Sequence, residues 1–299
     1  MARVFIFICL LLSWVPKSFS QELGTHWICY PTPNDSSEVL FCHTYTTPFW
    51  PQRAFVSFAS TGRVRVYVNE RNITRDICFY NPDTTTIAVK TYDITRFLRP
   101  DGNTIAVWYA PVQGQPISKQ LSLEYYGTDS RGRNFYRKAD GSWKCTLLEG
   151  CFTKNNKEEY FDASQYDNNW KAADHSRRGW LHPLGAYADA KSLPLSCDMS
   201  TKASNRLRNI LLPSGTSPTT EGMSCVFGYP FNGTIRVTLR NTQKGAILKI
   251  GNLTYTCSGE LDEQAFMRFL TSNDREFPII ESNQLKHVQI VNIEGLEYE

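Results

Sequence analysis

Acidic side chains are the first residues to consider for chemistry, because glycoside hydrolysis needs two carboxylates held a defined distance apart across the scissile bond. Glu260, Asp262 and Glu263 come closest to such a group. They stand at the start of residues 261–270, which we expect to form a helix, and the helix dipole favours acids at that end. Ordinary charge placement therefore explains them, and we assign no catalytic residue.

Motifs of other enzyme chemistries are missing from the sequence. It contains no nucleophile elbow, phosphate-binding loop, dinucleotide fingerprint, H-E-x-x-H motif or EF-hand loop. A zinc site is not expected, because there is no C-x-x-C and no histidine at ligand spacing near a cysteine. A structural calcium ion would fit a β-sandwich, but its ligands would come partly from backbone carbonyls and cannot be read from sequence. We expect no other cofactor.

Exposed aromatic rings are candidates for ligand binding, because their faces can stack on a ligand while amide, hydroxyl and charged side chains nearby bind its polar groups. The candidate ligand-binding residues stand at a strand end, in a loop-rich segment and between prolines: Trp108, Tyr109, Trp180, His182, Tyr187 and Trp50. Core packing is the alternative for each, since a tryptophan at a strand end is more often buried. We expect Trp143 and Trp170 to be core residues.

Cysteines supply a second kind of chemistry. Without Cys9, which lies in the leader described below, eight remain: Cys29, Cys42, Cys78, Cys145, Cys151, Cys197, Cys225 and Cys257. An even number in an exported chain predicts disulfides, although eight cysteines allow 105 connectivities. Cys145 and Cys151 bracket a short loop containing Gly150, so we expect them to pair.

Residues 1–20 have the features of a secretory signal. Arg3 precedes an apolar run at residues 4–14, too short to span a bilayer, and residues 18–20 (SFS) form a small-x-small cleavage site before Gln21. No later run reaches the roughly 18 apolar residues of a membrane span. We expect a soluble protein in the periplasm, on the cell surface or outside the cell.

Charge excludes one class of partner. The formal net charge is +3, and losing Arg3 and Lys17 with the leader would reduce it to +1. Such a balance gives no field that favours nucleic acid or a membrane surface.

Period-two alternation dominates the elements that must position these residues. We expect strands at residues 53–60, 64–69, 85–91, 103–109, 122–126, 234–240 and 246–250. Residues 64–68 should form a half-buried strand with its valines inward. Helix is expected only at residues 261–270, with one turn near residues 93–98. The fold class is therefore all-β, with two antiparallel β-sandwiches.

A domain junction is expected where periodicity fades. Residues 176–220 are rich in Gly, Pro, Ser and Asn, which is typical of a long connection or of loops. We place one sandwich at residues 21–180 and the second at residues 181–299. A well-packed loop region is the alternative and would move the junction without changing the architecture.

Short motifs carry a resemblance to a known family. Residues 62–69 (GRVRVYVN), 92–95 (YDIT) and 102–107 (GNTIAV) resemble the galactose-binding-like jelly roll of many glycosidases. Within that superfamily the sequence is most similar to the N-terminal part of bacterial α-L-rhamnosidases. The similarity continues through residues 123–126 (LEYY), 140–144 (DGSWK), 159–163 (EYFDA), 166–170 (YDNNW), 226–230 (VFGYP) and 233–239 (GTIRVTL).

The resemblance implies binding rather than catalysis. In rhamnosidases the catalytic carboxylates sit in an α/α barrel that follows the sandwiches, and this chain ends at Glu299 with no room for one. We therefore expect a non-catalytic carbohydrate-binding protein, accessory to polysaccharide degradation, with a glycan or a separate glycosidase chain as partner. Two alternatives stay open: a scaffold or interaction protein that binds no sugar, and a rhamnosidase-like glycosidase component with an unrecognised site.

Overall fold

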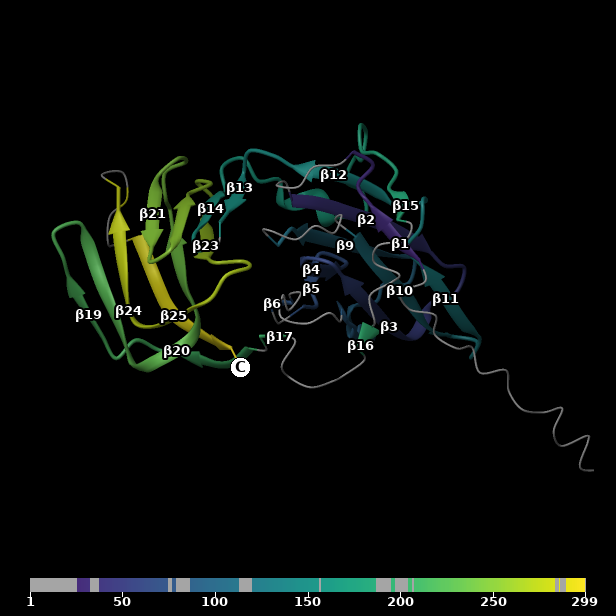
Figure 1. Cartoon of the computed structure of the whole chain (residues 1–299), viewed down its shortest axis with the longest axis horizontal. Coiled ribbons are helices and arrows are strands. Elements are labelled where there is room, and N and C mark those ends of the chain that lie inside the picture. Colours follow the sequence, from purple (N-terminus) through teal and green to yellow (C-terminus); the bar gives the residue numbers. More distant parts are fainter. Residues whose placement is uncertain are drawn as a thin grey trace, which may run out of the picture.

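The computed structural model shows a protein built almost entirely of β-strands and arranged in two lobes (Figure 1). It describes residues 26–32, 38–74, 77–78, 87–112, 120–155, 157–186, 195–196, 204–205, 207–282, 285 and 289–298. The leader at residues 1–20 lies outside them. The all-β class with antiparallel sandwich sheets is confirmed. Within the described ranges, no helix is long and apolar enough to cross a membrane.

The first lobe is a sandwich of two sheets. Its outer sheet has the order β15 (Leu184–Ala186), β1 (Trp27–Cys29), β10 (Gln120–Asp129), β3 (Pro51–Ser60) and β8 (Lys90–Asp93), with β11 (Asn134–Lys138) also paired to β10. Its inner sheet has the order β12 (Lys144–Leu148), β2 (Glu38–Thr46), β9 (Gly102–Ala110), β4 (Arg63–Val68), β6 (Ile77–Cys78) and β17 (Ser204–Asn205), with β5 (Arg71–Asn72) paired to β4. A separate parallel bridge joins β7 (Ile87–Ala88) to β16 (Leu195–Ser196).

The second lobe is formed by one large folded sheet. Its order is β13 (Phe152–Lys154), β14 (Glu159–Asp162), β22 (Leu253–Thr256), β21 (Ile247–Ile250), β24 (Ser272–Glu281), β20 (Gly222–Arg240), β25 (Ile290–Tyr298) and β18 (Leu207–Leu211), with β19 (Gly215–Pro218) and β23 (Asp262–Phe266) also paired to β20. Strand β20 pairs first with β24 and then with β25 and β23, with an irregularity between Val226 and Phe231. This long strand therefore serves both halves of the lobe.

The chain passes between the lobes more than once. After β12 of the first lobe, β14 pairs in parallel with β22 of the second, through residues 159–162 and 253–256. The chain then returns, because Leu181 bridges to Cys145 and β15 pairs with β1. Sheet membership therefore does not divide at one residue, and the domain limits at residues 180 and 181 stay a prediction about independently folding units.

Alternation along β9 explains how the layers stack. Ile105, Val107 and Tyr109 face a core between the two sheets of the first lobe, whereas Ala106 and Trp108 face a core shared with the second lobe. The inner sheet is thus buried on both faces. The outer face of the outer sheet, which carries β3, β10 and β11, points away from the second lobe.

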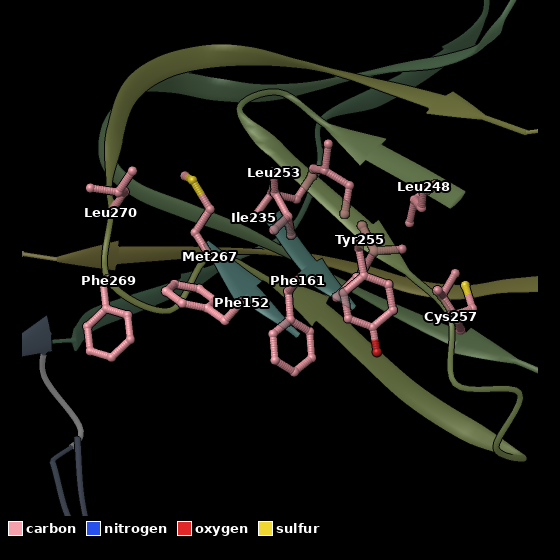
Figure 2. Packing of buried hydrophobic residues seen from close by; sticks show 14 of the residues in the cluster. Phe152, Phe161, Ile235, Leu248, Leu253, Tyr255, Cys257, Met267, Phe269 and Leu270 are labelled. Carbon is pink, nitrogen blue, oxygen red and sulfur yellow. The ribbon is translucent and has the colours of Figure 1, made fainter. Parts of the chain in front are cut away.

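The shared core joins the lobes through aromatic packing. Phe152 and Phe161, from β13 and β14, point into the same cluster as Tyr255 and Phe269 of the second lobe (Figure 2). Trp170, in this shared core, and Trp143, in the core of the first lobe, are 2% and 0% exposed, as predicted for core residues. Burial of this apolar area is the main term that holds the two lobes together.

The helix predicted at residues 261–270 is wrong. Residues 262–266 form β23, which pairs with residues 236–240 of β20, so sheet pairing overrides the local helical preference. Glu263 is buried at 7% exposure and accepts hydrogen bonds from Tyr255 OH at 2.9 Å and Ser258 N at 2.8 Å. Its carboxylate fastens a turn, and the acids here do not cap a helix.

The predicted Cys145–Cys151 disulfide is also wrong. Both thiols are free, as are those of Cys29, Cys42, Cys225 and Cys257. The reason is that the two cysteines face different cores: Cys145 packs between the sheets of the first lobe, and Cys151 packs in the shared core. The Cys78 side chain and Cys197 lie outside the described residues.

Candidate functional site

The structure buries two of the predicted ligand-binding residues. Trp108 and Tyr109 are each 1% exposed. The ring of Trp108 packs against Phe152 and Phe269, with ring centroids 5.1 and 5.2 Å away, and the Tyr109 hydroxyl shares a 2.9 Å hydrogen bond with the Thr61 hydroxyl. A ring covered on both faces cannot stack on a sugar, so core packing, the alternative for both residues, accounts for them.

The other predicted residues that the structure describes differ in exposure and in the groups they contact. Trp180 is half-buried, with its ring centroid 6.5 Å from that of Trp170. His182 is exposed, with Nε2 2.8 Å from Lys144 Nζ and Nδ1 2.7 Å from a backbone carbonyl. Tyr187 lies outside the described residues. Trp50 is 56% exposed and remains a candidate ligand-binding residue.

A row of three rings that the sequence analysis did not single out crosses the outer sheet. Phe55 of β3 is the direct cross-strand partner of Tyr126 of β10, which in turn is the partner of Tyr136 of β11. We call these three residues the aromatic row. The Phe55 and Tyr126 rings are stacked, with centroids 5.7 Å apart and planes 23° apart. The row repeats at the spacing of neighbouring strands, about 4.8 Å.

Strand alternation places the aromatic row on the outer face of the first lobe. Its sequence neighbours Ala54, Val56 and Tyr125 face the core between the two sheets, so the row must face the opposite way. Tyr136 is 39% exposed, and Phe55 and Tyr126 are partly exposed.

Polar residues flank the aromatic row on the neighbouring register positions. On one side lie Arg53, Thr128 and Asn134, which are direct partners across β3, β10 and β11. On the other side the Ser57 hydroxyl contacts the Tyr126 hydroxyl at 3.1 Å, and Tyr136 OH donates to Glu124 Oε1 at 2.6 Å. Ser57 and Glu124 are buried, so the polar groups beside the rings that a ligand can reach are those of Arg53, Thr128 and Asn134.

Trp50 lies by the hairpin turn that joins β10 to β11. The backbone carbonyl of Trp50 accepts a 2.8 Å hydrogen bond from Ser130 N. Beside it, the Phe49 ring has the guanidinium groups of Arg131 and Arg133 at 3.7 and 4.4 Å from its centroid. The exposed Trp50 and these two arginines thus lie at the end of the outer sheet that also carries Arg53, Thr128 and Asn134.

Asp129 shapes that hairpin turn. Its Oδ1 accepts hydrogen bonds from the backbone N–H groups of Arg131 and Arg133, at 2.9 and 3.0 Å, and its Oδ2 pairs with the Arg133 guanidinium at 2.9 Å. Although burial acts to raise it, these donors hold the pKa of Asp129 below its usual value. The ionised carboxylate therefore fixes the turn and already has its partners within the chain.

A groove of about 610 Å³ opens beside the inner sheet. We call it the Glu70 groove; it is lined by Glu70, Arg99, Asn169, Ala172, Ala173, Asp174 and His175. Glu70 Oε1 pairs with Arg99 Nη2 at 3.3 Å, and His175 Nδ1 lies 3.5 Å from Asp167 Oδ2. The His175 ring also contacts the predicted Trp180, with centroids 6.0 Å apart.

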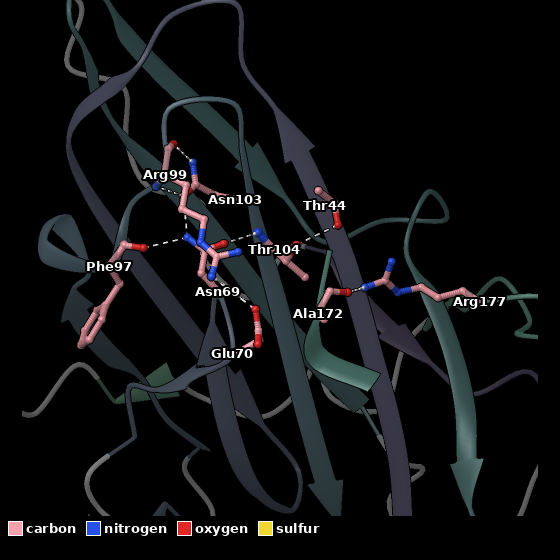
Figure 3. A network of polar contacts seen from close by, with 9 residues as sticks. All are labelled: Thr44, Asn69, Glu70, Phe97, Arg99, Asn103, Thr104, Ala172 and Arg177. Carbon is pink, nitrogen blue, oxygen red and sulfur yellow. Dashed lines mark hydrogen bonds and ion pairs between the residues drawn. The ribbon is translucent and has the colours of Figure 1, made fainter. Parts of the chain in front are cut away.

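A hydrogen-bond network supports Glu70 and Arg99 of this groove (Figure 3). Asn69 has φ 48° and Glu70 has φ 71°, which is the left-handed region that asparagine tolerates in turns at strand ends. The Asn69 amide donates to Phe97 O at 2.7 Å and to Asn103 Oδ1 at 2.9 Å, and Asn103 Oδ1 also accepts from Arg99 N at 2.8 Å. Glu70 and Arg99 therefore meet over a rigid base.

Lys171 lies beneath the same region, in a 3₁₀ turn at Asn168–Lys171. Its ammonium donates to Asn168 Oδ1 at 2.6 Å and lies 4.9 Å from the Tyr67 ring centroid. Burial lowers the pKa of Lys171 to about 8. This lysine ties the turn to the inner sheet rather than lining the groove.

Metal binding finds little support in the part of the chain that the structure describes. There, no three His, Cys, Asp or Glu side chains come together as a site. A calcium site built mainly from backbone carbonyls stays a prediction.

The aromatic row could have been found from the sequence by one further step. Residues 129–132 (DSRG) form the turn of the β10–β11 hairpin, with Gly132 at φ 73°, and turn residues between two alternating runs are a hairpin signal. Pairing residues 122–126 with a strand after that turn would have put Tyr126 opposite Tyr136. The neighbouring strand β3 could not be aligned without the structure, because its register depends on contacts distant in sequence.

Known proteins resemble this chain in fold and not in sequence. No family model matches the chain, and no curated protein matches it. Among solved structures, the α-L-rhamnosidase from Dictyoglumus thermophilum superposes with a TM-score of 0.76 at 17% identity, over 92% of this chain and 35% of that one. The chain has the β-sandwich fold of α-L-rhamnosidases.

Two further rhamnosidases give the same result. The enzyme from Aspergillus terreus has a TM-score of 0.73 at 16% identity, over 92% of this chain and 36% of its own. The Streptomyces avermitilis enzyme, complexed with L-rhamnose, has a TM-score of 0.73 at 17% identity, over 90% and 29%. This chain thus spans about a third of the length of the rhamnosidases it matches, and the predicted resemblance to their sandwich part, without the catalytic barrel, is confirmed as a likeness of fold.

Proposed function

We propose that this protein is an exported, non-catalytic carbohydrate-binding protein that holds glycans on the aromatic row. The observation that carries the proposal is the alignment of Phe55, Tyr126 and Tyr136 on three adjacent strands of an outward-facing sheet. The exposed parts of these rings give the C–H groups of successive sugars an apolar surface to pack on, and the flanking hydroxyl, amide and guanidinium groups can bind the sugar hydroxyls. Export is supported by the leader sequence at residues 1–20.

A flat surface sets the expected strength of binding. It excludes less water than an enclosed pocket and fixes fewer ligand groups, so we expect a Kd on the order of 10 μM to 1 mM, or about 4 to 7 kcal/mol. Such an affinity suits an accessory protein that keeps a polysaccharide near a separate glycosidase chain, since several weak contacts along a polymer add avidity.

Paired tyrosine substitutions test the proposal. Tyr136→Ala removes a ring of the row, whereas Tyr160→Ala removes a ring of the second lobe with matching properties: 44% exposed, with its hydroxyl bonded to Glu158. Titration calorimetry against ligands chosen from a glycan array should show binding weakened at least fivefold by Tyr136→Ala, about 1 kcal/mol. Tyr160→Ala should bind as the wild type does, and both variants should keep the wild-type melting temperature.

Two results would contradict the proposal. Silence of the wild-type protein across a broad glycan and polysaccharide array would favour the alternative of a scaffold protein without a sugar ligand. Equal weakening by Tyr136→Ala and Tyr160→Ala would place the binding surface elsewhere.

Hydrolysis is the second candidate function, favoured by the Glu70 groove. Two carboxylates, Glu70 and Asp174, line it together with His175, and a pair of carboxylates is what glycosidases use. Release of sugar from aryl glycosides, including an aryl rhamnoside, or from plant polysaccharide by the purified chain would support this function if Glu70→Gln abolished it. No release by the wild type would refute it.

A further inference from the structure

Arginines dominate the charged groups at the Trp50 end of the outer sheet. Arg53 extends the row of polar positions beside Phe55, and Arg131 and Arg133 stand on the β10–β11 turn. Arg133 is paired with Asp129 at 2.9 Å. Among the described residues, Arg53 and Arg131 form no ion pair.

Both unpaired arginines are held by ring faces instead of carboxylates. The Arg53 guanidinium lies 5.0 Å from the Phe55 ring centroid, and that of Arg131 lies 3.7 Å from the Phe49 centroid. A guanidinium stacked on a ring keeps its N–H donors at its edge, because they point outward in the plane of the group. That edge can bind a carboxylate through two parallel hydrogen bonds.

The nearby acids are already engaged within the chain. Asp129 accepts from the turn and from Arg133, as described above. Asp93, the cross-strand partner of Phe55, accepts from Thr95 N at 2.9 Å, and hydrogen bonds from Thr95, together with the charge of Arg53, lower the pKa of Asp93. Among the described residues, Arg53 and Arg131 therefore form no salt bridge, and the charge of Arg53 acts on Asp93 without a direct contact between the two groups.

We infer that the aromatic row selects acidic glycans, with Arg53 and Arg131 binding the carboxylates of uronate residues that pack against the row. The inference rests on the proposed carbohydrate-binding function and adds its ligand class. Apolar contact with the row supplies affinity that any sugar shares, while the two guanidinium groups supply a preference for carboxylate.

A ligand pair that differs only in charge tests the inference. The probes are α-1,4-linked galacturonate oligosaccharides and their methyl esters, titrated into the full chain at 50 and 200 mM salt. The acid form should bind at least tenfold more tightly than the ester at low salt, and the difference should shrink at high salt. Arg53→Gln and Arg131→Gln should each reduce the preference for the acid over the ester at least threefold. Arg71→Gln, an exposed arginine on β5 of the inner sheet, is the matched control and should keep the full preference.

Each other outcome has a defined meaning. Equal binding of acid and ester, with both weakened by Tyr136→Ala, would overturn the inference and leave the carbohydrate-binding function standing. Loss of preference in Arg71→Gln as well, or tighter binding of dextran sulfate than of galacturonate, would show a general charge effect and overturn the carboxylate assignment. Binding of no sugar at all would remove the proposed function itself.

Discussion

Replacing Glu159 by Gln should loosen the loop at residues 268–270, through which the second lobe contacts the first. Glu159 is fully buried, and its carboxylate accepts three backbone hydrogen bonds of 2.6 Å: Oε2 from Arg268 N, and Oε1 from Phe269 N and Leu270 N. The same loop is held from the first lobe, because Arg63 Nη1 donates to Phe269 O at 2.6 Å. Glutamine keeps the shape of the side chain but replaces one oxygen by a donor.

The cost can be worked out from these contacts. If the amide oxygen keeps Phe269 and Leu270, the N–H of Arg268 faces an NH₂ group, and an unsatisfied buried donor costs about 1 to 3 kcal/mol. The two retained bonds lose their ionic character, at about 1 kcal/mol each. Burial raises the pKa of Glu159, so a neutral group recovers part of the desolvation penalty. The expected loss in the free energy of unfolding is about 2 to 4 kcal/mol.

Urea unfolding followed by tryptophan fluorescence measures this loss. The control is Glu158→Gln, the same chemical change one residue earlier, where the carboxylate accepts from Tyr160 OH on the surface at 2.9 Å. That variant should stay within about 0.5 kcal/mol of the wild type. If Glu159→Gln behaved like Glu158→Gln, the three hydrogen bonds would not be holding this loop.

Three further predictions concern the cores. Trp108→Ala should destabilise the protein by about 3 to 5 kcal/mol in the same assay, whereas Trp50→Ala should stay within about 0.5 kcal/mol of the wild type. Equal destabilisation by the two substitutions would refute the burial of Trp108 and the exposure of Trp50. Burial raises the pKa of Cys145 to about 12 and that of Cys151 to about 11, so Ellman's reagent should label both thiols only after unfolding, and labelling of the native protein within minutes would be inconsistent with this. Because the pKa of Lys171 is lowered to about 8, the unfolded chain binds more protons than the native chain between pH 8 and 10. The unfolding free energy of the wild type should therefore rise with pH, relative to that of Lys171→Met, by up to about 1.4 kcal/mol per pH unit. Parallel pH profiles of the two proteins would contradict this prediction.

Local patterns predicted the strands well but not what covers them. Residues 64–68 were expected to form a strand with one exposed face carrying Arg65 and Tyr67. Both residues are buried, at 7% and 9% exposure, since Arg65 Nε donates to Arg268 O of the second lobe at 2.9 Å. The alternation was interpreted correctly, whereas burial of the second face depends on a contact 203 residues away.

The candidate site shows the same limit. The alternating pattern shows which residues of a strand share one face of the sheet. It does not show whether that face is buried, because Trp108 and Tyr126 stand in similar alternating runs. Trp108 is covered because the inner sheet lies between two cores, and Tyr126 is partly exposed because the outer sheet has a core on one side. Which sheet lies in the middle is decided by tertiary packing, so local sequence could not separate core rings from surface rings.

The return of the chain from the second lobe to the first has a consequence for synthesis. The β13–β14 hairpin emerges roughly 90 residues before its parallel partner β22, at about 5 to 20 residues per second. For that interval the rings of Phe152 and Phe161 have no complete core to enter. Pairing across such a sequence separation is slow. The newly made chain therefore exposes these aromatic rings for seconds before their core is complete. We expect aggregation during synthesis to begin at this hairpin.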